Sequence, residues 1–137
     1  MRVLALDVGD RTIGIAASDA LLFTAQGVET IRRTFLERDL QRLQQLMQEY
    51  ETDTLVVGFP KNMDGSQGVR CDIVKAFAEA VKEQIPGTNV IFWDERLSTV
   101  AAAKSLIAAD VSRAKRKKVI DKMAAVFILQ GYLDSLK

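Results

Sequence analysis

Residues 3–18 read VLALDVGDRTIGIAAS, an apolar run, a turn and a second apolar run. The apolar run over residues 3–6 is typical of a buried strand, and Asp7 ends this run. The glycine and aspartate that follow indicate a turn, and residues 12–18 return as a second strand. An unpaired carboxylate inside an apolar strand is costly, so Asp7 is the first candidate for a functional role. A purely structural role is the alternative.

Outward from this segment, continuous apolar runs alternate with segments in which apolar residues recur at helical spacing. Further strands are expected at residues 22–31, 54–58 and 89–93, and helices at residues 36–50, 69–85, 98–108 and 119–136. Thr34 and Glu37 have the capping-box spacing, which predicts that Thr34 caps the first helix. The order βββαβαβαα predicts an α/β fold, a mixed five-stranded sheet with helices on both faces.

Length and composition limit the classes of protein. The chain has 137 residues, of which 48% are hydrophobic and 27% charged. These values predict a single domain over residues 1–137 and exclude a disordered chain. The sequence contains no histidine, which excludes a Ser-His-Asp triad and a zinc site with histidine ligands.

Cysteine usage and hydropathy predict a cytoplasmic location. Cys71 is the only cysteine, so it cannot form an intrachain disulfide, and a reducing compartment is the simplest interpretation. No apolar stretch approaches the ~18 residues of a membrane span, so we expect no membrane partner.

Net charge is +1, but basic residues concentrate in one segment. The segment from Arg96 to Lys118 has seven basic residues and one acidic residue, whereas the remainder has 12 basic and 17 acidic residues. This distribution predicts a polyanionic partner. The candidate phosphate contacts are Arg113, Lys115, Arg116, Lys117 and Lys118, with Lys61 as a further substrate contact. A solvated loop without a ligand is the alternative for the basic run.

Three carboxylates lie at the ends of predicted strands and helices, where active sites gather. Asp7 and Glu95 end strands, and Asp121 lies in the first turn expected for the last helix. Carboxylates that converge repel one another unless a cation lies between them, and oxygen ligands favour Mg²⁺ or Mn²⁺. Such a site next to a basic patch suits phosphodiester hydrolysis. The alternative for Asp121 is a structural role, in which it stabilises a helix N-terminus. Strand alternation predicts that Asp94 points away from Glu95.

Four stretches carry a resemblance to a known family. They are residues 6–16 (LDVGDRTIGIA), 57–60 (VGFP), 93–99 (WDERLST) and 121–125 (DKMAA). In order and spacing they resemble the YqgF/RuvX family, bacterial proteins with an RNase H-like fold. Members are described as Holliday-junction resolvases and as nucleases for the 5′ end of pre-16S rRNA. The resemblance covers essentially the whole chain.

The resemblance implies roles for individual residues. Asp7, Glu95 and Asp121 match the acids of the family's first strand, DER motif and last helix, and would bind one or two Mg²⁺ or Mn²⁺ ions. Arg96 follows as a phosphate or structural partner. Arg11 stands where many members have a Lys-Arg pair, and it would contact nucleic acid.

The leading hypothesis is therefore a metal-dependent nuclease of structured nucleic acid. Its expected substrate is the 5′ end of pre-16S rRNA in ribosome biogenesis, and it would act as a monomer or homodimer. One alternative is a Holliday-junction resolvase that cuts branched DNA. Another is a non-catalytic RNA-binding module for ribosome assembly. An ATP-binding domain of the actin and sugar-kinase type is disfavoured, because the chain has no GxxxxGK motif and no room for a second such domain.

Overall fold

The computed structural model describes residues 2–62, 64–95 and 113–137, with the backbone path alone for residues 113–122. Its strands are β1 (Leu4–Val8), β2 (Thr12–Ser18), β3 (Ala25–Arg32), β4 (Thr54–Phe59) and β5 (Asn89–Asp94). Its helices are α1 (Leu36–Glu49), α2 (Val69–Gln84) and α4 (Arg113–Ser135). The helix predicted at residues 98–108 lies outside the described residues.

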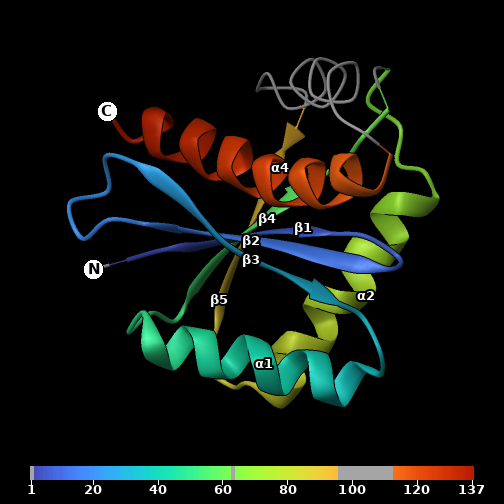
Figure 1. Cartoon of the computed structure of the whole chain (residues 1–137), viewed down its shortest axis with the longest axis horizontal. Helices are drawn as coiled ribbons and strands as arrows, with labels where there is room; N and C mark the ends of the chain where they lie inside the picture. The colour runs from blue at the N-terminus through green and yellow to red at the C-terminus, as the bar shows by residue number, and fades with distance from the viewer. Residues whose placement is uncertain (1, 63, 96–112) are drawn as a thin grey trace.

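The strands form one mixed sheet in the order β3-β2-β1-β4-β5. β1, β2 and β3 pair antiparallel, and β4 and β5 continue parallel to β1. Helix α4 covers one face of the sheet, and α1 and α2 cover the other (Figure 1). The predicted α/β fold with a mixed five-stranded sheet is confirmed.

The alternation of β1 divides the core between the two faces. Leu4 and Leu6 are buried in the cluster beneath α1 and α2, which also contains Cys71. Ala5 belongs to the cluster beneath α4, together with Ala125 and Ile128. Position 7 therefore follows Ala5 onto the face covered by α4. Among the described residues, no helix has both the length and the apolar character needed to cross a membrane.

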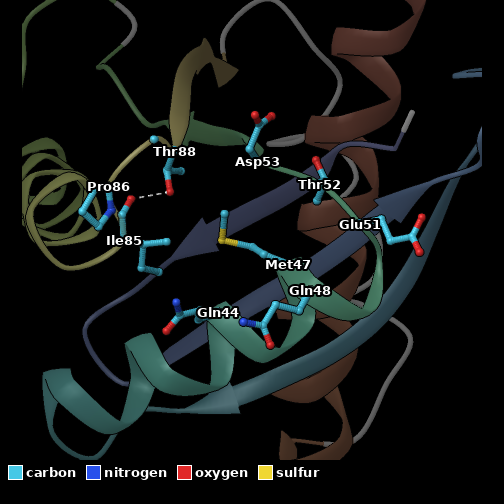
Figure 2. A pocket seen from close by; sticks show the side chains of 10 residues that line it. Gln44, Met47, Gln48, Glu51, Thr52, Asp53, Ile85, Pro86 and Thr88 are labelled. Carbon is cyan, nitrogen blue, oxygen red and sulfur yellow. Dashed lines mark hydrogen bonds between the residues drawn. The ribbon is translucent and has the colours of Figure 1, made fainter.

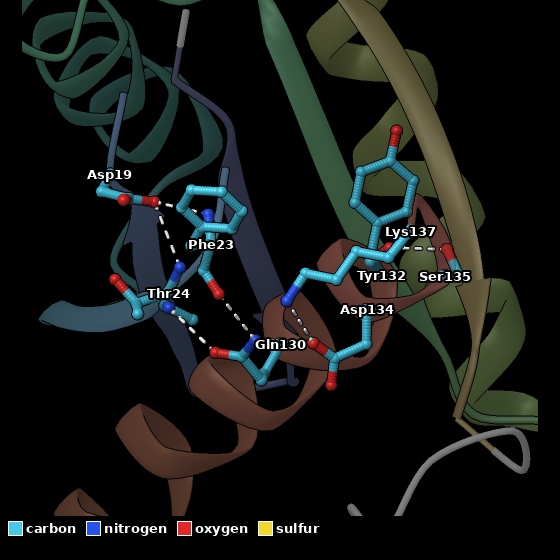
Figure 3. Close-up of polar contacts among 9 residues, drawn as sticks. Asp19, Phe23, Thr24, Gln130, Tyr132, Asp134, Ser135 and Lys137 are labelled. Atoms are coloured by element: carbon cyan, nitrogen blue, oxygen red, sulfur yellow. Dashed lines mark hydrogen bonds and ion pairs between the residues drawn. The ribbon is translucent and has the colours of Figure 1, made fainter. Parts of the chain in front are cut away.

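Strand β3 begins later than the sequence pattern predicted, at Ala25 rather than residue 22. The carboxylate of Asp19 accepts hydrogen bonds from the N–H groups of Phe23, at 2.8 Å, and Thr24, at 3.1 Å (Figure 3). These bonds, above all the one from Thr24, hold the pKa of Asp19 below its usual value. Leu22 has a φ of 62°, so the chain turns there instead of extending.

The β2–β3 hairpin anchors the C-terminal half of α4 (Figure 3). The side-chain amide of Gln130 donates to the carbonyl of Phe23 at 3.0 Å and accepts from the N–H of Ala25 at 3.1 Å. One side chain thus bridges the helix and the start of β3. This contact helps to fix the helix on which Asp121 lies.

The predicted cap of α1 is wrong. The helix begins at Leu36, its N-cap position is Phe35, and no side chain caps it. The N–H of Thr34 donates instead to Asp39 Oδ1 at 3.3 Å, and Asp39 Oδ2 is 3.5 Å from Arg33 Nε. The first turn is instead closed by the backbone, because the N–H groups of Arg38 and Asp39 donate to the carbonyl of Phe35.

Within the described part of the chain, helix α4 runs over Arg113–Ser135 and so includes the six residues before the predicted start at residue 119. The basic run is therefore helical rather than a loop, and Asp121 lies more than two turns after Arg113 rather than in a first turn. Residues 113–118 read RAKRKK, all strong helix formers, so the helix extends through them although they carry no apolar stripe.

A bidentate ion pair joins β3 to α1 and predicts a pH-dependent stability. Arg42 donates to Glu29 at 2.6 and 2.9 Å, and this hydrogen bonding lowers the pKa of Glu29 from its usual 4.5. A carboxyl whose pKa is lowered by folding adds stability above about pH 4.5, and this stability is lost as the pH falls through the folded pKa. Because the pair is partly exposed, Glu29→Gln should cost only about 0.5 kcal/mol at pH 7.

Urea denaturation from pH 7 to pH 4 measures this difference. The gap between wild type and Glu29→Gln should narrow at the acidic end. Glu83→Gln is the matched control on an exposed part of α2, and it should change stability little at any pH. A pH-independent gap for Glu29→Gln would contradict the prediction.

Candidate active site

Asp7 lies near the carboxyl end of β1, on the face of the sheet covered by α4. It pairs with Gly14 of β2 on one side. On the other side, Leu6 pairs with Val57, so Asp7 lies beside Gly58 of β4 if this register continues by one residue. The Asp7 side chain is only 7% exposed. A carboxylate is therefore held at the end of the central strand, inside the layer between sheet and helix.

Glu95 directly follows β5, the edge strand that lies two strands away from β1. A Cβ atom added to Gly58 would lie 2.7 Å from Glu95 Oε1 and would overlap Ile128 Cδ1. The Glu95 carboxylate therefore extends back over β4, on the face that carries Asp7. With neighbouring strands ~4.8 Å apart, Glu95 Oε1 comes within about 7.5 Å of Asp7 Cβ.

The bare backbone of Gly58 makes this arrangement possible. The sequence motif VGFP contains Gly58, but sequence reasoning assigned it no role. A glycine within the strand segment TLVVGF was nevertheless a usable signal, because strand glycines often indicate a close approach by another group. Here two groups approach, Ile128 from α4 and Glu95 from the end of β5.

Asp121 lies on α4, and its backbone position is described while its side chain is not. It precedes Ala124 and Ala125, which are buried against the sheet, and it precedes Ile128 by two turns. By the helical period, position 121 lies on the sheet-facing side of α4, about 10 Å along the axis from Ile128. The structure does not describe the side chain of Asp121. Among the side chains that it does describe, no three acidic or cysteine side chains lie close enough together to hold a metal ion.

Asp94 lies on the opposite face from Glu95, as strand alternation predicts. Phe92 and Asp94 line a pocket with Phe59, which belongs to the core beneath α1 and α2. Trp93, between them, packs into the core beneath α4. Among the candidate carboxylates, Asp7 and Glu95 therefore share a face, and Asp94 does not join them.

The predicted basic contacts fall in several places. Arg11 is exposed in the turn between β1 and β2, and the Lys61 ammonium lies 5.9 Å from the Phe59 ring. Arg96 lies outside the described residues. The backbone of the basic run forms the first turns of α4, whereas its side chains lie outside the described part of the chain; the run comprises Arg113, Lys115, Arg116, Lys117 and Lys118.

Arg33 braces the turn that follows Asp7, a role that sequence reasoning missed. Its Nη1 donates to the carbonyl of Gly9 at 2.7 Å, and its guanidinium lies 5.4 Å from the Phe77 ring. The same side chain pairs with the buried Asp39. No sequence signal distinguishes Arg33 from Arg32, because its contacts come from three separate elements.

A cleft of about 500 Å³ lies at the other end of the sheet (Figure 2). Its lining comes from the last turns of α1, the segment before β4 and the segment between α2 and β5, including Met47, Asp53 and Pro86. Figure 2 shows these side chains around an open space near the amino ends of β4 and β5. None of the predicted site residues lines this cleft, whereas Asp7 and Glu95 lie at the carboxyl ends of β1 and β5.

Known proteins match this chain over essentially its whole length. A family model described as "RuvX: Holliday junction resolvase" matches residues 1–135. A protein of Desulfitobacterium hafniense is 58% identical, covering 100% of this chain and 94% of its own. Proteins of Desulforamulus reducens and Clostridium tetani are 61% and 53% identical, covering 98% and 99% of this chain and 98% of their own. All three are named "Putative pre-16S rRNA nuclease".

Solved structures share the fold at low sequence identity. RuvC of T. thermophilus in complex with a Holliday junction substrate matches with a TM-score of 0.60 and 14% identity, covering 100% of this chain and 97% of its own. The Holliday junction resolvase of fowlpox virus matches with a TM-score of 0.54 and 16% identity, covering 100% of both chains. These likenesses support the RNase H-like architecture expected from the sequence.

Proposed function

Because the chain belongs to the RuvX family and is a nuclease, we propose that it hydrolyses phosphodiester bonds in precursor 16S rRNA, at the 5′ end. The single observation that carries the proposal is the position of Glu95, whose carboxylate extends over Gly58 on the face that bears Asp7. Relatives at 53% to 61% identity named for this substrate support the choice of RNA. In this proposal residues 1–137 act as one nuclease domain in ribosome biogenesis, in the cytoplasm.

The carboxylates fit a divalent metal site. Nucleases similar to RuvC and RuvX generally use divalent metals, and hard carboxylate oxygens favour Mg²⁺ or Mn²⁺ over softer metals. Asp7, Glu95 and Asp121 would hold one or two ions. When bound, the ions would activate a water molecule and neutralise charge on the departing oxygen.

The protein's own groups would orient these ligands and the substrate. Asp7 lies within a strand that is paired on both sides, so its backbone is held rigidly, as a precise site requires. Gly58 leaves the space through which Glu95 approaches. The described part of α4 opens with the basic run and has no acidic residue among its first residues, so this end of the helix would attract phosphates.

Cleavage of Holliday junctions is the second candidate, favoured by the description of the matching family model. A four-way junction is two-fold symmetric, so its resolution requires a symmetric dimer that presents two sites. Cutting one end of an RNA needs only one site. Sedimentation of the protein with each substrate therefore distinguishes a homodimer on DNA from a monomer on RNA.

The test compares two labelled substrates, a 5′-extended 16S rRNA fragment and a four-way DNA junction, in Mg²⁺, in Mn²⁺ and with EDTA. Wild type should cut the RNA in either metal, lose activity in EDTA and regain it when the metal is restored. Preferential cutting of the junction would transfer the proposal to the second candidate. No cutting of either substrate in either metal would overturn the nuclease mechanism.

A further inference from the structure

A pocket of about 320 Å³ lies next to the candidate active site, on the opposite face of the sheet. Its lining consists of Phe59, Lys61, Gln67, Lys75, Phe92 and Asp94. Asp94 directly precedes Glu95, so one peptide unit separates the pocket from the carboxylate that reaches over Gly58. Both features lie at the carboxyl ends of β4 and β5, and a chain that rounds this end of the sheet could touch both.

The floor of the pocket is aromatic. Phe59 and Phe92 pack with their ring centroids 5.1 Å apart and their planes inclined by 58°. Phe59 is buried, at 6% exposure, whereas Phe92 remains 42% exposed. An open aromatic face of this kind offers a stacking surface for a nucleobase, whatever its sequence.

Two lysines approach the same aromatic floor. The Nζ atoms of Lys61 and Lys75 lie 5.9 and 5.8 Å from the centroid of Phe59. Lys75 comes from α2 and also donates to Gln67, so its ammonium is held by two partners. The pocket lining thus carries two ammonium groups and one carboxylate, that of Asp94, and a phosphate group would balance the remaining positive charge. A phosphate group fits this charge, and the aromatic floor beside it fits the attached base.

We propose that this pocket binds one unpaired nucleotide of the substrate, next to the scissile phosphate. The base stacks on Phe92, and Lys61 and Lys75 bind its phosphate. A base within a duplex is stacked on its neighbours, so only a single-stranded nucleotide or one turned out of a helix can enter. This inference rests on the proposed nuclease function and adds a requirement for single-stranded character beside the cut.

Binding of a fluorescein-labelled RNA 12-mer in EDTA tests the pocket without cleavage. Phe92→Ala should weaken binding of the single strand by about 5- to 100-fold, and Phe92→Tyr should restore it. A blunt RNA duplex of the same sequence should bind wild type, Phe92→Ala and Phe92→Tyr equally. Phe23→Ala is the matched control, because Phe23 is an exposed phenylalanine on the remote β2–β3 hairpin, and it should bind as wild type does.

Lys75→Gln tests the phosphate contact with a surface substitution that leaves the core intact. It should lower the slope of log binding constant against log salt by about 1 for the single strand. Lys82→Gln, at an exposed position on the same helix, should leave the slope unchanged.

Three outcomes would overturn the inference. They are unchanged single-strand binding by Phe92→Ala, an equal loss of duplex binding, and a salt slope unaffected by Lys75→Gln. If wild type cuts the rRNA fragment while any of these results holds, the pocket proposal fails and the proposed function stands. If the pocket variants behave as expected but wild type cuts nothing, the failure lies with the nuclease mechanism.

Discussion

Asp7→Asn should abolish most cleavage while leaving the protein folded. Loss of a carboxylate ligand removes charge stabilisation worth several kcal/mol, and each 1.36 kcal/mol is tenfold in rate. A fall in kcat on the order of 10³-fold is therefore expected. Asparagine has nearly the same shape as aspartate but no charge. The substitution therefore opens no cavity at this position, which is only 7% exposed.

Asp10→Asn is the matched control for this prediction. Asp10 lies three residues away, is exposed in the turn after β1, and accepts asparagine without strain, since both residues favour turns. Kinetics on the rRNA fragment and thermal unfolding would be measured for both variants. Activity retained by Asp7→Asn would remove the carboxylate mechanism and support a non-catalytic RNA-binding module. Activity lost together with folding would reassign Asp7 to a structural role.

The two proposed carboxylates differ in how far sequence could predict them. Asp7 follows from a local rule alone, because an apolar run that ends at a carboxylate marks that residue as a functional candidate. The position of Glu95 depends on strand order, on the register of β4 with β5 and on the missing side chain of Gly58. These are non-local features, so the motif alone could not show that Gly58 leaves the space through which Glu95 approaches.

The discrepancies between prediction and structure have similar causes. The pattern of apolar residues located every described element, but it could not show where α4 begins, because residues 113–118 are helix formers without an apolar stripe. The Thr34 cap failed because the helix begins at Leu36 with Phe35 at its N-cap position, and Thr34 instead donates its N–H to Asp39. The pocket around Phe92 was missed because its lysines come from a loop and from α2, which are close only in the folded chain.

Gly58→Ala should be the most damaging substitution that changes no polar group. The added methyl would overlap Ile128 Cδ1 and lie 2.7 Å from Glu95 Oε1, so α4 or the end of β5 must shift. Overpacking of this kind costs about 1–3 kcal/mol in stability. Displacement of a catalytic group by about 1 Å can cost on the order of 10²-fold in rate, so both properties should decline.

Ile128→Val separates these two effects, because it removes the one methyl group that overlaps the new Cβ. In Gly58→Ala/Ile128→Val, stability should recover part of what Gly58→Ala lost. Cleavage should stay low, since the contact with Glu95 remains, and a double-mutant cycle measures this difference. Gly68→Ala is the control glycine, because its Cβ would meet only the Asn62 side chain, at 3.6 Å. If Gly58→Ala cleaves normally, or if Ile128→Val restores cleavage along with stability, then the approach of Glu95 over β4 is not what the reaction requires. In either case the second strand-end ligand must be sought elsewhere along this edge of the sheet.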